Sequence, residues 1–473
     1  MLFHSFEFAV FFPAFFVLYW ALFRQRLARN LLLVAGSYWF YAAWDWRFLA
    51  LIILSSAVDY VVALRISAHD DKRSRRMWLA VSLCVNLGLL LYFKYVNFFI
   101  ASFNDLTQAL GLQVNTRSVD VILPVGISFY TFQTLSYTID VYRKTTTATR
   151  DVAAFFAYVS FFPQLIAGPI ERSEHLLPQF QRPVTFSNAQ ATSGARLFLW
   201  GFFKKAAIAD SCAVVVDVIF ADPNASALAR VLGAVLFAFQ IYGDFSGYSD
   251  MAIGLSRMLG IDLMQNFRFP YFSRDIAEFW RRWHISLSTW FRDYLYIPLG
   301  GNGGNKWVRL RNVSAVFLVS GFWHGANWTF IAWGALNAAL FVPLMLTGKN
   351  RRYLEASTGL WPSPLELGAM FTTFSLTCVC WVFFRALTVH DAVDYIAGVA
   401  HGGLALPAQV NARLLILLPF LVVEWLMHRG VFAQMTAWAP RPVRWACYFG
   451  LLALSTFFLY SHDHAVRFIY FDF

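Results

Sequence analysis

Three observations on the sequence predict an all-α protein that crosses a membrane many times. Of its 473 residues, 59% are hydrophobic and 14% are charged, whereas a soluble domain carries about 25% charged residues. The apolar residues fall in runs of roughly 20, the length at which a helix spans a bilayer. Lys and Arg gather in short clusters between these runs, as they do in cytoplasmic loops. We therefore expect a polytopic membrane protein.

The apolar runs give the order of the elements. Candidate spans begin near residues 6, 30, 48, 77, 121, 152, 197, 231, 313, 367, 412 and 445. They predict about eleven to thirteen helices in a single integral-membrane domain covering residues 1–473. The first run precedes Arg24, Arg26 and Arg29, which is the reverse of the order in a signal peptide. We expect an uncleaved first helix whose N-terminus lies outside, and cytoplasmic basic clusters after it and at residues 69–76.

Composition also excludes several classes of protein. A net charge of +11 would suggest nucleic acid as the partner of a soluble protein. Here the basic residues lie between apolar runs, so we predict no nucleic-acid partner. The five cysteines lie in or beside apolar runs, which indicates no disulfide framework. The sequence has no HExxH and no cluster of Cys and His, so we predict no catalytic metal.

Some apolar runs contain residues that break helices. Pro and Gly interrupt residues 123–137, Gly168 and Pro169 lead into a polar stretch that ends at residue 183, and two lysines divide residues 201–210. Irregular backbone at membrane depth is tolerated where it is buried in protein or lines a cavity. These breaks favour a hollow bundle.

One histidine stands in an apolar stretch, SGFWHGANWTF. No Asp, Glu, Lys or Arg occurs from Val313 to Leu346, and His324 is eleven residues into that run. At 1.5 Å per residue this places it about 16 Å deep, near the middle of a bilayer, and we expect Gly321 and Gly325 to leave room beside it. Ionisable groups at that depth usually face an interior pathway. The alternative is a histidine that bonds to a neighbouring helix and serves packing.

A second segment, residues 267–304, is too charged to span a bilayer. Its apolar residues recur at helical spacing from Asp275 to Leu295, with Ser273 as a candidate N-cap. Glu278 is placed to pair with Arg281 or Arg282. The whole stretch could be an interfacial amphipathic helix, and its histidine, His284, a structural residue.

Two carboxylates, Asp244 and Asp250, stand in another apolar span. Their spacing puts them on opposite sides of a helix, so they do not form an acid–base pair. Buried carboxylates in a membrane are costly and need partners. We expect one to pair with an arginine of the 267–304 segment, and the other to cap a helix or face a polar cavity.

These motifs together resemble the membrane-bound O-acyltransferase family. The stretch FWRRWHISLSTWFRDYLYIPLGGN, followed by SGFWHGANWTFIAWG, carries the resemblance, and YGDFSGYSDMAIG and LIAGPI are similar to its bacterial branch. That branch includes the membrane subunits of alginate O-acetylation and of teichoic-acid D-alanylation, and the closing FIYFDF looks like the alginate type. The motif-bearing core covers residues of about 120–345. The resemblance implies a ring of tilted helices around a central tunnel, with re-entrant and interfacial helices.

The resemblance also implies a reaction. An acetyl group is transferred from a cytoplasmic thioester across the bacterial inner membrane. The donor substrate is acetyl-coenzyme A. The transfer serves the O-acetylation of an alginate-like or cellulose-like exopolysaccharide. No bound cofactor is implied. The implied partners are the lipid bilayer, the polysaccharide and a periplasmic acyltransferase of the SGNH-like Ser-Asp-His hydrolase type. His324 matches the family's near-invariant histidine and His284 its second.

The chemistry of the residues fits this reaction. A neutral imidazole is suited to take a proton from an attacking hydroxyl group, so we assign His324 as general base. His284 would orient the acceptor or stabilise the oxyanion. Arg281, Arg282, Arg292 and Lys306 would attract phosphates or serve equally well as interfacial anchors. The further candidates for the tunnel and substrate site are Trp323, Asn327, Ser320, Asp244, Ser246, Arg281, Arg282, Arg292 and Asp293.

Two other functions compete with this interpretation. In a transporter or flippase, His324, Asp244 and Asp250 would form a proton relay, although the sequence lacks the paired halves that transporters often show. In a scaffold that merely anchors another enzyme, a polar ring at mid-membrane would have no explanation. Substitution of His324 separates the three functions.

Overall fold

A computed structural model of the chain describes residues 1–112, 114, 116–354, 359–461 and 468–469. These residues form helices and loops, and no strand occurs among them, which confirms the all-α prediction. The chain divides into two compact units. The first comprises Met1–Phe198 and Met251–Met264, and the second comprises Leu199–Asp250 and Gln265–Phe473.

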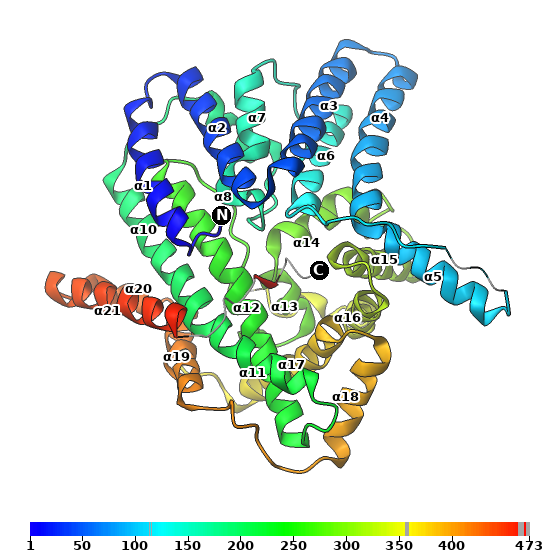
Figure 1. The fold of residues 1–473 in the computed structure, drawn as a ribbon, viewed down its shortest axis with the longest axis vertical. Coiled ribbons are helices and arrows are strands. Elements are labelled where there is room, and N and C mark those ends of the chain that lie inside the picture. The colour runs from blue at the N-terminus through cyan, green and yellow to red at the C-terminus, as the bar shows by residue number, and fades with distance from the viewer. Residues whose placement is uncertain (113, 115, 355–358, 462–467, 470–473) are drawn as a thin grey trace. The chain divides into compact units, whose positions relative to one another are not determined.

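The first unit holds the N-terminal helices, which Figure 1 shows in blue to green. They are α1 (Phe6–Ala21), α2 (Arg26–Asp45), α3 (Leu49–Ala68), α4 (Lys72–Leu90), α5 (Val96–Ala109), α6 (Ile127–Arg143), α7 (Val152–Ser160), α8 (Phe162–Leu165), α9 (Ser173–Gln181) and the start of α10 (Asn188–Phe203). Helices α3, α4 and α6 pack together. The buried carboxylate of Asp59 on α3 accepts hydrogen bonds from Ser82 and, at 2.9 Å, from Asn86 on α4. The polar bonds fix these helices against one another.

The loop directly after α8, residues 166–171, is buried in protein, as its irregular backbone requires. Gly126 has a φ of 76°, and a Cβ there would lie 2.7 Å from the Leu165 carbonyl oxygen. Glycine therefore permits the loop before α6 to approach α8. Further along, the fully buried Glu171 accepts hydrogen bonds from His175 Nδ1 at 2.8 Å and from the Met264 backbone N–H. The loop is thus tied to its own unit by side chains and backbone.

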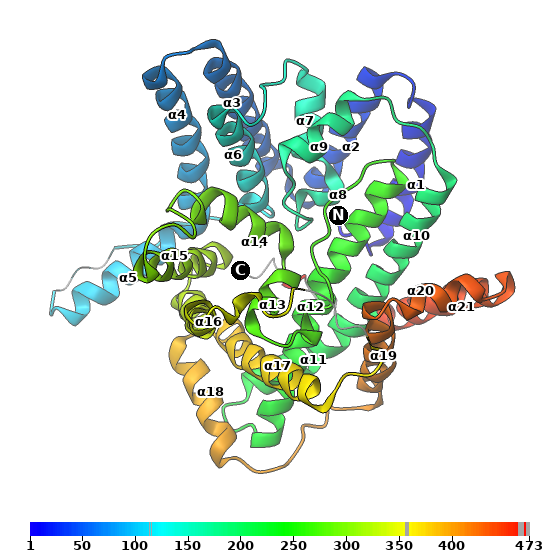
Figure 2. The ribbon, with the colours of Figure 1, turned by 180° about the vertical axis from the view of Figure 1, so that it is seen from behind.

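The second unit holds the remaining helices, seen from behind in Figure 2. They are α11 (Asp210–Ala221), most of α12 (Ala227–Met258), α13 (Ile276–Arg282), α14 (Ile285–Phe291), α15 (Lys306–His324), α16 (Trp328–Leu346), α17 (Pro364–Arg385), α18 (Val389–His401), α19 (Leu417–His428), α20 (Val431–Trp438) and α21 (Arg441–Tyr460). Wider π-helical turns cover Lys204–Ala209 and Arg292–Tyr296. Helices α15 and α16 form a hairpin, and α17 packs against α16.

Several helical stretches of the described chain are long and apolar enough to cross a membrane. The six that meet both conditions are Arg26–Ala68, Lys72–Ala109, Ala227–Met258, Trp328–Leu346, Pro364–Arg385 and Arg441–Tyr460. The shorter helix Phe6–Ala21 is also apolar. Other runs that the sequence marked as spans are divided in the structure. The run from residue 152 gives α7 and α8, and the run from residue 197 contains the π-helical turn Lys204–Ala209.

Candidate functional site

The apolar run that contains His324 is a helical hairpin. Helix α15 ends at His324, and α16 begins at Trp328. The prediction of one continuous span with His324 at its middle was therefore wrong, because the histidine lies where the two helices turn. A Cβ on Gly321 would lie 2.2 Å from the Phe330 carbonyl oxygen. Small residues let two helix backbones approach closely, so this glycine serves the hairpin.

The imidazole of His324 is enclosed by aromatic rings. His324 is only 4% exposed to solvent. Its ring centroid lies 4.9 Å from that of Trp323, 5.1 Å from Trp333 on α16 and 5.2 Å from Phe384 on α17. The room that Gly325 was expected to leave is filled, since a Cβ there would lie 2.1 Å from the Phe330 ring. Three helices thus fix the position of one ionisable side chain.

His284 enters the same site from a break in the central segment. The predicted helix from Asp275 to Leu295 is interrupted, because α13 ends at Arg282 and α14 starts at Ile285. Between them His284 has a φ of 44°. This left-handed backbone conformation is rare for residues other than glycine and often marks functional sites. The two histidine ring centroids are 6.5 Å apart. Two separate elements therefore bring the candidate catalytic residues together.

The cap of α13 differs from the prediction. The Asp275 side chain accepts the Glu278 backbone N–H at 2.7 Å and is the N-cap. Ser273, which the sequence suggested, donates its hydroxyl to the Pro270 carbonyl at 2.6 Å. The N-cap thus lies two residues later than expected.

Asn266 holds the backbone and side chain of the His284 turn. Its Oδ1 lies 3.2 Å from His284 Nδ1, 3.3 Å from the Ser286 backbone nitrogen and 2.9 Å from Ser286 Oγ. Its own carbonyl accepts the Ile285 N–H at 2.9 Å. Asn266 is fully buried. Burial lowers the pKa of His284 to about 3, so this ring is neutral at physiological pH.

A cavity of about 260 Å³ lies within the second unit, and its lining includes Ser288 on the helix that follows His284 and Ser320 on the helix that ends at His324. Side chains of α13 to α16 line it. Its polar lining residues are Ser288, Arg292, Asn302, Ser320 and Asn350. Ser320 lies on α15 one helical turn before His324. The cavity therefore extends from a cationic group to within a turn of the candidate base.

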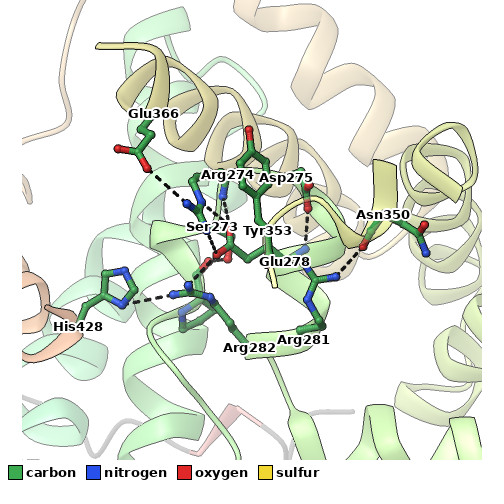
Figure 3. A network of polar contacts seen from close by, with 11 residues as sticks. Ser273, Arg274, Asp275, Glu278, Arg281, Arg282, Asn350, Tyr353, Glu366 and His428 are labelled. Carbon is green, nitrogen blue, oxygen red and sulfur yellow. Dashed lines mark hydrogen bonds and ion pairs between the residues drawn. The ribbon is translucent and has the colours of Figure 1, made fainter. Parts of the chain in front are cut away.

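Arg281 and Arg282 are engaged in a polar network that Figure 3 shows. Arg282 donates to Glu278 at 2.6 Å, which confirms the predicted pairing. Arg281 donates to the backbone carbonyls of Asn350 and Tyr353 at 2.8 and 3.0 Å. Both guanidinium groups hold α13 in place, and their role in attracting phosphates stays a prediction.

The same network ties α13 to two later helices. Arg274 forms ion pairs with Glu278 at 3.0 Å and with Glu366, near the start of α17, at 3.3 Å. Arg282 also lies 3.3 Å from Nδ1 of His428, the last residue of α19. Paired and hydrogen-bonded charges are the form in which proteins tolerate burial. The segment that carries His284 is therefore tied to both α17 and α19.

The remaining cationic candidates are more open. Arg292 pairs with Asp293 at 2.7 Å, and its side chain is 60% exposed while it also lines the cavity. Lys306 is exposed at the first turn of α15. Of the four candidates for attracting phosphates, Arg292 is the one that borders the cavity, with Asp293 as its neighbour and partner.

The two intramembrane aspartates pair with lysines, and the expected pairing with an arginine of the central segment was wrong. Lys205 lies 2.9 Å from Asp244 and 2.8 Å from Asp210, and Lys204 lies 2.6 Å from Asp250. Asp244 also accepts the Ile469 backbone N–H at 2.7 Å. The π-helical turn at residues 204–209 thus supplies the partner cations.

Two other candidates have structural contacts. Ser246 donates its hydroxyl to the Tyr242 carbonyl of its own helix at 2.6 Å. Asn327 caps α16 by accepting the Thr329 N–H at 3.0 Å, and its amide donates to the Leu387 carbonyl at 2.8 Å. These contacts explain both residues without a substrate.

Among the sequence candidates, the structure brings together His284, His324 and Trp323, with Ser320 and Arg292 at the adjoining cavity. Sequence reasoning missed Asn266, which carries no motif of its own and lies eighteen residues from the histidine it contacts. It also missed Trp333 and Phe384, because aromatic residues are too frequent in this chain to stand out. Lys204 and Lys205 were noticed as a helix break, and their ion pairs with the aspartates were not anticipated.

The fold and the site define a polytopic membrane protein with a pair of buried histidines at the ends of helices that also line a cavity. Residues 148–356 match the model of the membrane-bound O-acyltransferase family. The chain is 44% identical to the "probable alginate O-acetylase AlgI" of Pseudomonas syringae pv. tomato over 81% of its own length and 72% of that protein. It is 36% identical to the peptidoglycan O-acetyltransferase of Helicobacter pylori, over 79% and 74% of the two chains.

A more distant relative is the teichoic acid D-alanyltransferase of Bacillus subtilis, which is 27% identical over 56% of this chain and 69% of that protein. The relatives named here are all acyl-transferring enzymes by name. The chain belongs to the membrane-bound O-acyltransferase family, and it is an acyltransferase of the membrane.

Proposed function

We propose that this protein transfers an acetyl group from acetyl-coenzyme A, on the cytoplasmic side of the bacterial inner membrane, towards O-acetylation of alginate or a related exopolysaccharide. The observation that carries the proposal is the close His284–His324 pair, together with a cavity lined by Arg292 and by Ser320, one helical turn before His324. The likeness at 44% identity to alginate O-acetylases supports alginate as the acceptor class.

His324 is the general base of the proposed reaction. The acceptor's hydroxyl oxygen bonds to the thioester carbonyl carbon while its proton passes to the imidazole, which must be neutral to receive it. The carbon–sulfur bond then breaks, and the proton ends on the departing thiolate, so the histidine returns to its neutral state. No metal or bound cofactor enters this scheme. Among the described residues, no three His, Cys, Asp or Glu side chains gather as metal ligands.

The donor is proposed to occupy the cavity at Ser320. Arg292, exposed at the cavity, is suited to a phosphate of coenzyme A. The apolar side chains of Phe317, Phe341 and Met345 suit the acetyl group and the apolar part of the donor next to it. The acetyl group passes to a periplasmic acyltransferase partner of the SGNH-like hydrolase type, which completes delivery to the polysaccharide.

The transporter alternative depended on a relay through His324, Asp244 and Asp250. Both carboxylates pair with lysines, Lys205 and Lys204, so these charges compensate each other within the protein. The family also consists of acyl-transferring enzymes. Acyl transfer therefore accounts for the site better than proton-coupled transport.

The test follows labelled acetyl from acetyl-coenzyme A in membranes that carry this protein and its partner. His324→Ala is expected to lower transfer about 10²-fold or more at equal expression. The matched control is His401→Ala, an exposed histidine at the end of α18, which should leave transfer unchanged. Equal transfer by wild type and His324→Ala would mean that His324 is a packing residue. No transfer by the wild type would exclude acetyl-coenzyme A as donor.

A further inference from the structure

The side-chain amide of Asn266 has a fixed orientation. The atom that faces Ser286 lies 3.3 Å from its backbone nitrogen. A backbone N–H can only donate, so that atom of Asn266 must be the oxygen. On the other side of the amide, Nδ2 lies 3.4 Å from Ser249 Oγ, which can accept. The two neighbours thus settle which end of the amide points to the histidine.

The orientation of Asn266 determines the tautomer of His284. The same Oδ1 lies 3.2 Å from His284 Nδ1, and an amide oxygen only accepts. Nδ1 must therefore carry the proton. The ring is neutral because it is buried, and a neutral imidazole has one N–H and one accepting nitrogen. Nε2 of His284 is consequently an acceptor.

We propose that Asn266 is a positioning residue that fixes the Nδ1–H tautomer of His284, so that Nε2 of His284 receives the hydrogen bond of the acceptor's hydroxyl group. Resting on the proposed function, this inference decides between the two roles that His284 could have. Stabilising an oxyanion requires a donor, and Nε2 in this tautomer cannot donate. The role left to His284 is to orient the hydroxyl group next to His324.

The left-handed backbone at His284 fits this role. The conformation at φ 44° is unfavourable for a residue other than glycine and persists where its surroundings fix it. Asn266 supplies that support through its backbone carbonyl to Ile285 and its side chain to Ser286. One residue thus sets both the backbone and the tautomer of the histidine.

The first arm of the test is independent of catalysis. Solid-state NMR of [15N]histidine-labelled protein in bilayers reports which ring nitrogen carries the proton, and His284→Gln identifies the His284 signals by their loss. We expect protonated Nδ1 and unprotonated Nε2 in the wild type, and a mixture of tautomers in Asn266→Ala. Protonated Nε2 in the wild type, or an unchanged tautomer in Asn266→Ala, would overturn the inference.

The second arm measures acyl transfer. Asn266→Ala is expected to lower kcat about 10- to 100-fold, by analogy with the loss of a partner that orients a metal-bound histidine, with the KM for donor unchanged. Asn266→Asp keeps an oxygen acceptor for Nδ1 and should recover most of this loss at neutral pH. Its carboxylate stabilises the imidazolium, so the acid limb of its pH–rate profile should move to higher pH.

Two comparisons separate positioning from a structural effect. Asn312→Ala removes another buried amide, which donates to the Gly301 carbonyl at 3.2 Å, and should not reproduce the change in kcat. In a His284→Gln background, Asn266→Ala should cost nothing further, because residues that act as one unit are not additive. The same fold-loss in both backgrounds would overturn the inference. If the wild type transfers no acetyl, the donor proposal fails, while the NMR arm still decides the tautomer.

Discussion

At the scale of single residues, the candidate site is two histidines whose surroundings differ. His324 is buried and packs against the rings of Trp323, Trp333 and Phe384. His284 has a polar anchor in Asn266. The cavity is lined at one point by Ser320, a small residue on the same face of α15 as His324. A small side chain at that position keeps the space open.

Ser320→Leu tests the cavity as the donor site. The larger side chain fills space one turn before His324, so the KM for acetyl-coenzyme A should rise about tenfold or more, as expected when ground-state binding is lost. Steady-state kinetics in membranes measure the change. The control Ser320→Ala keeps the space and should stay near the wild-type value. An unchanged KM in Ser320→Leu would place the donor elsewhere.

At the scale of elements, the sequence predicted a helical central segment and missed its break. The apolar spacing from Asp275 to Leu295 is helical in both α13 and α14, so periodicity could not reveal the turn between them. That turn depends on Asn266, which is distant in sequence. In the same way, the apolar run around His324 contains no charge at the α15–α16 turn, and hydropathy counted it as one span.

The π-helical turn at residues 204–209 carries the second prediction at this scale. Lys205→Met leaves the carboxylates of Asp210 and Asp244 buried without their shared cation. Removing one partner of a buried ion pair typically costs about 3–5 kcal/mol, so the thermal unfolding midpoint of the purified protein in detergent should fall.

The double variant Lys205→Met with Asp244→Asn removes one of the two stranded charges and should regain part of the lost stability. If Lys205→Met alone unfolds at the wild-type temperature, the cluster does not stabilise the second unit. Such a result would reopen a functional role for these aspartates.

At the scale of the whole molecule, the amino-acid composition was enough to predict a membrane protein, and the sequence motifs were enough to predict its family. An apolar fraction of 59% requires lipid contact, and the model match at residues 148–356 contains both histidines. The polar contacts of Asp244, Asp250 and Arg282 could be only partly predicted, because the ion-pair partner Lys205 and the hydrogen-bond partner His428 come from distant segments. Tertiary packing selects them among many similar residues.

The most direct test of the central claim, that His284 and His324 act together on one acceptor hydroxyl, is a double-mutant cycle. Single-turnover acetyl transfer would be measured for wild type, His324→Ala, His284→Gln and the double variant at equal expression. The account predicts that the double variant is no slower than the slower single variant, as for residues that work as one catalytic unit. Losses that multiply would contradict it and show that the two histidines act independently.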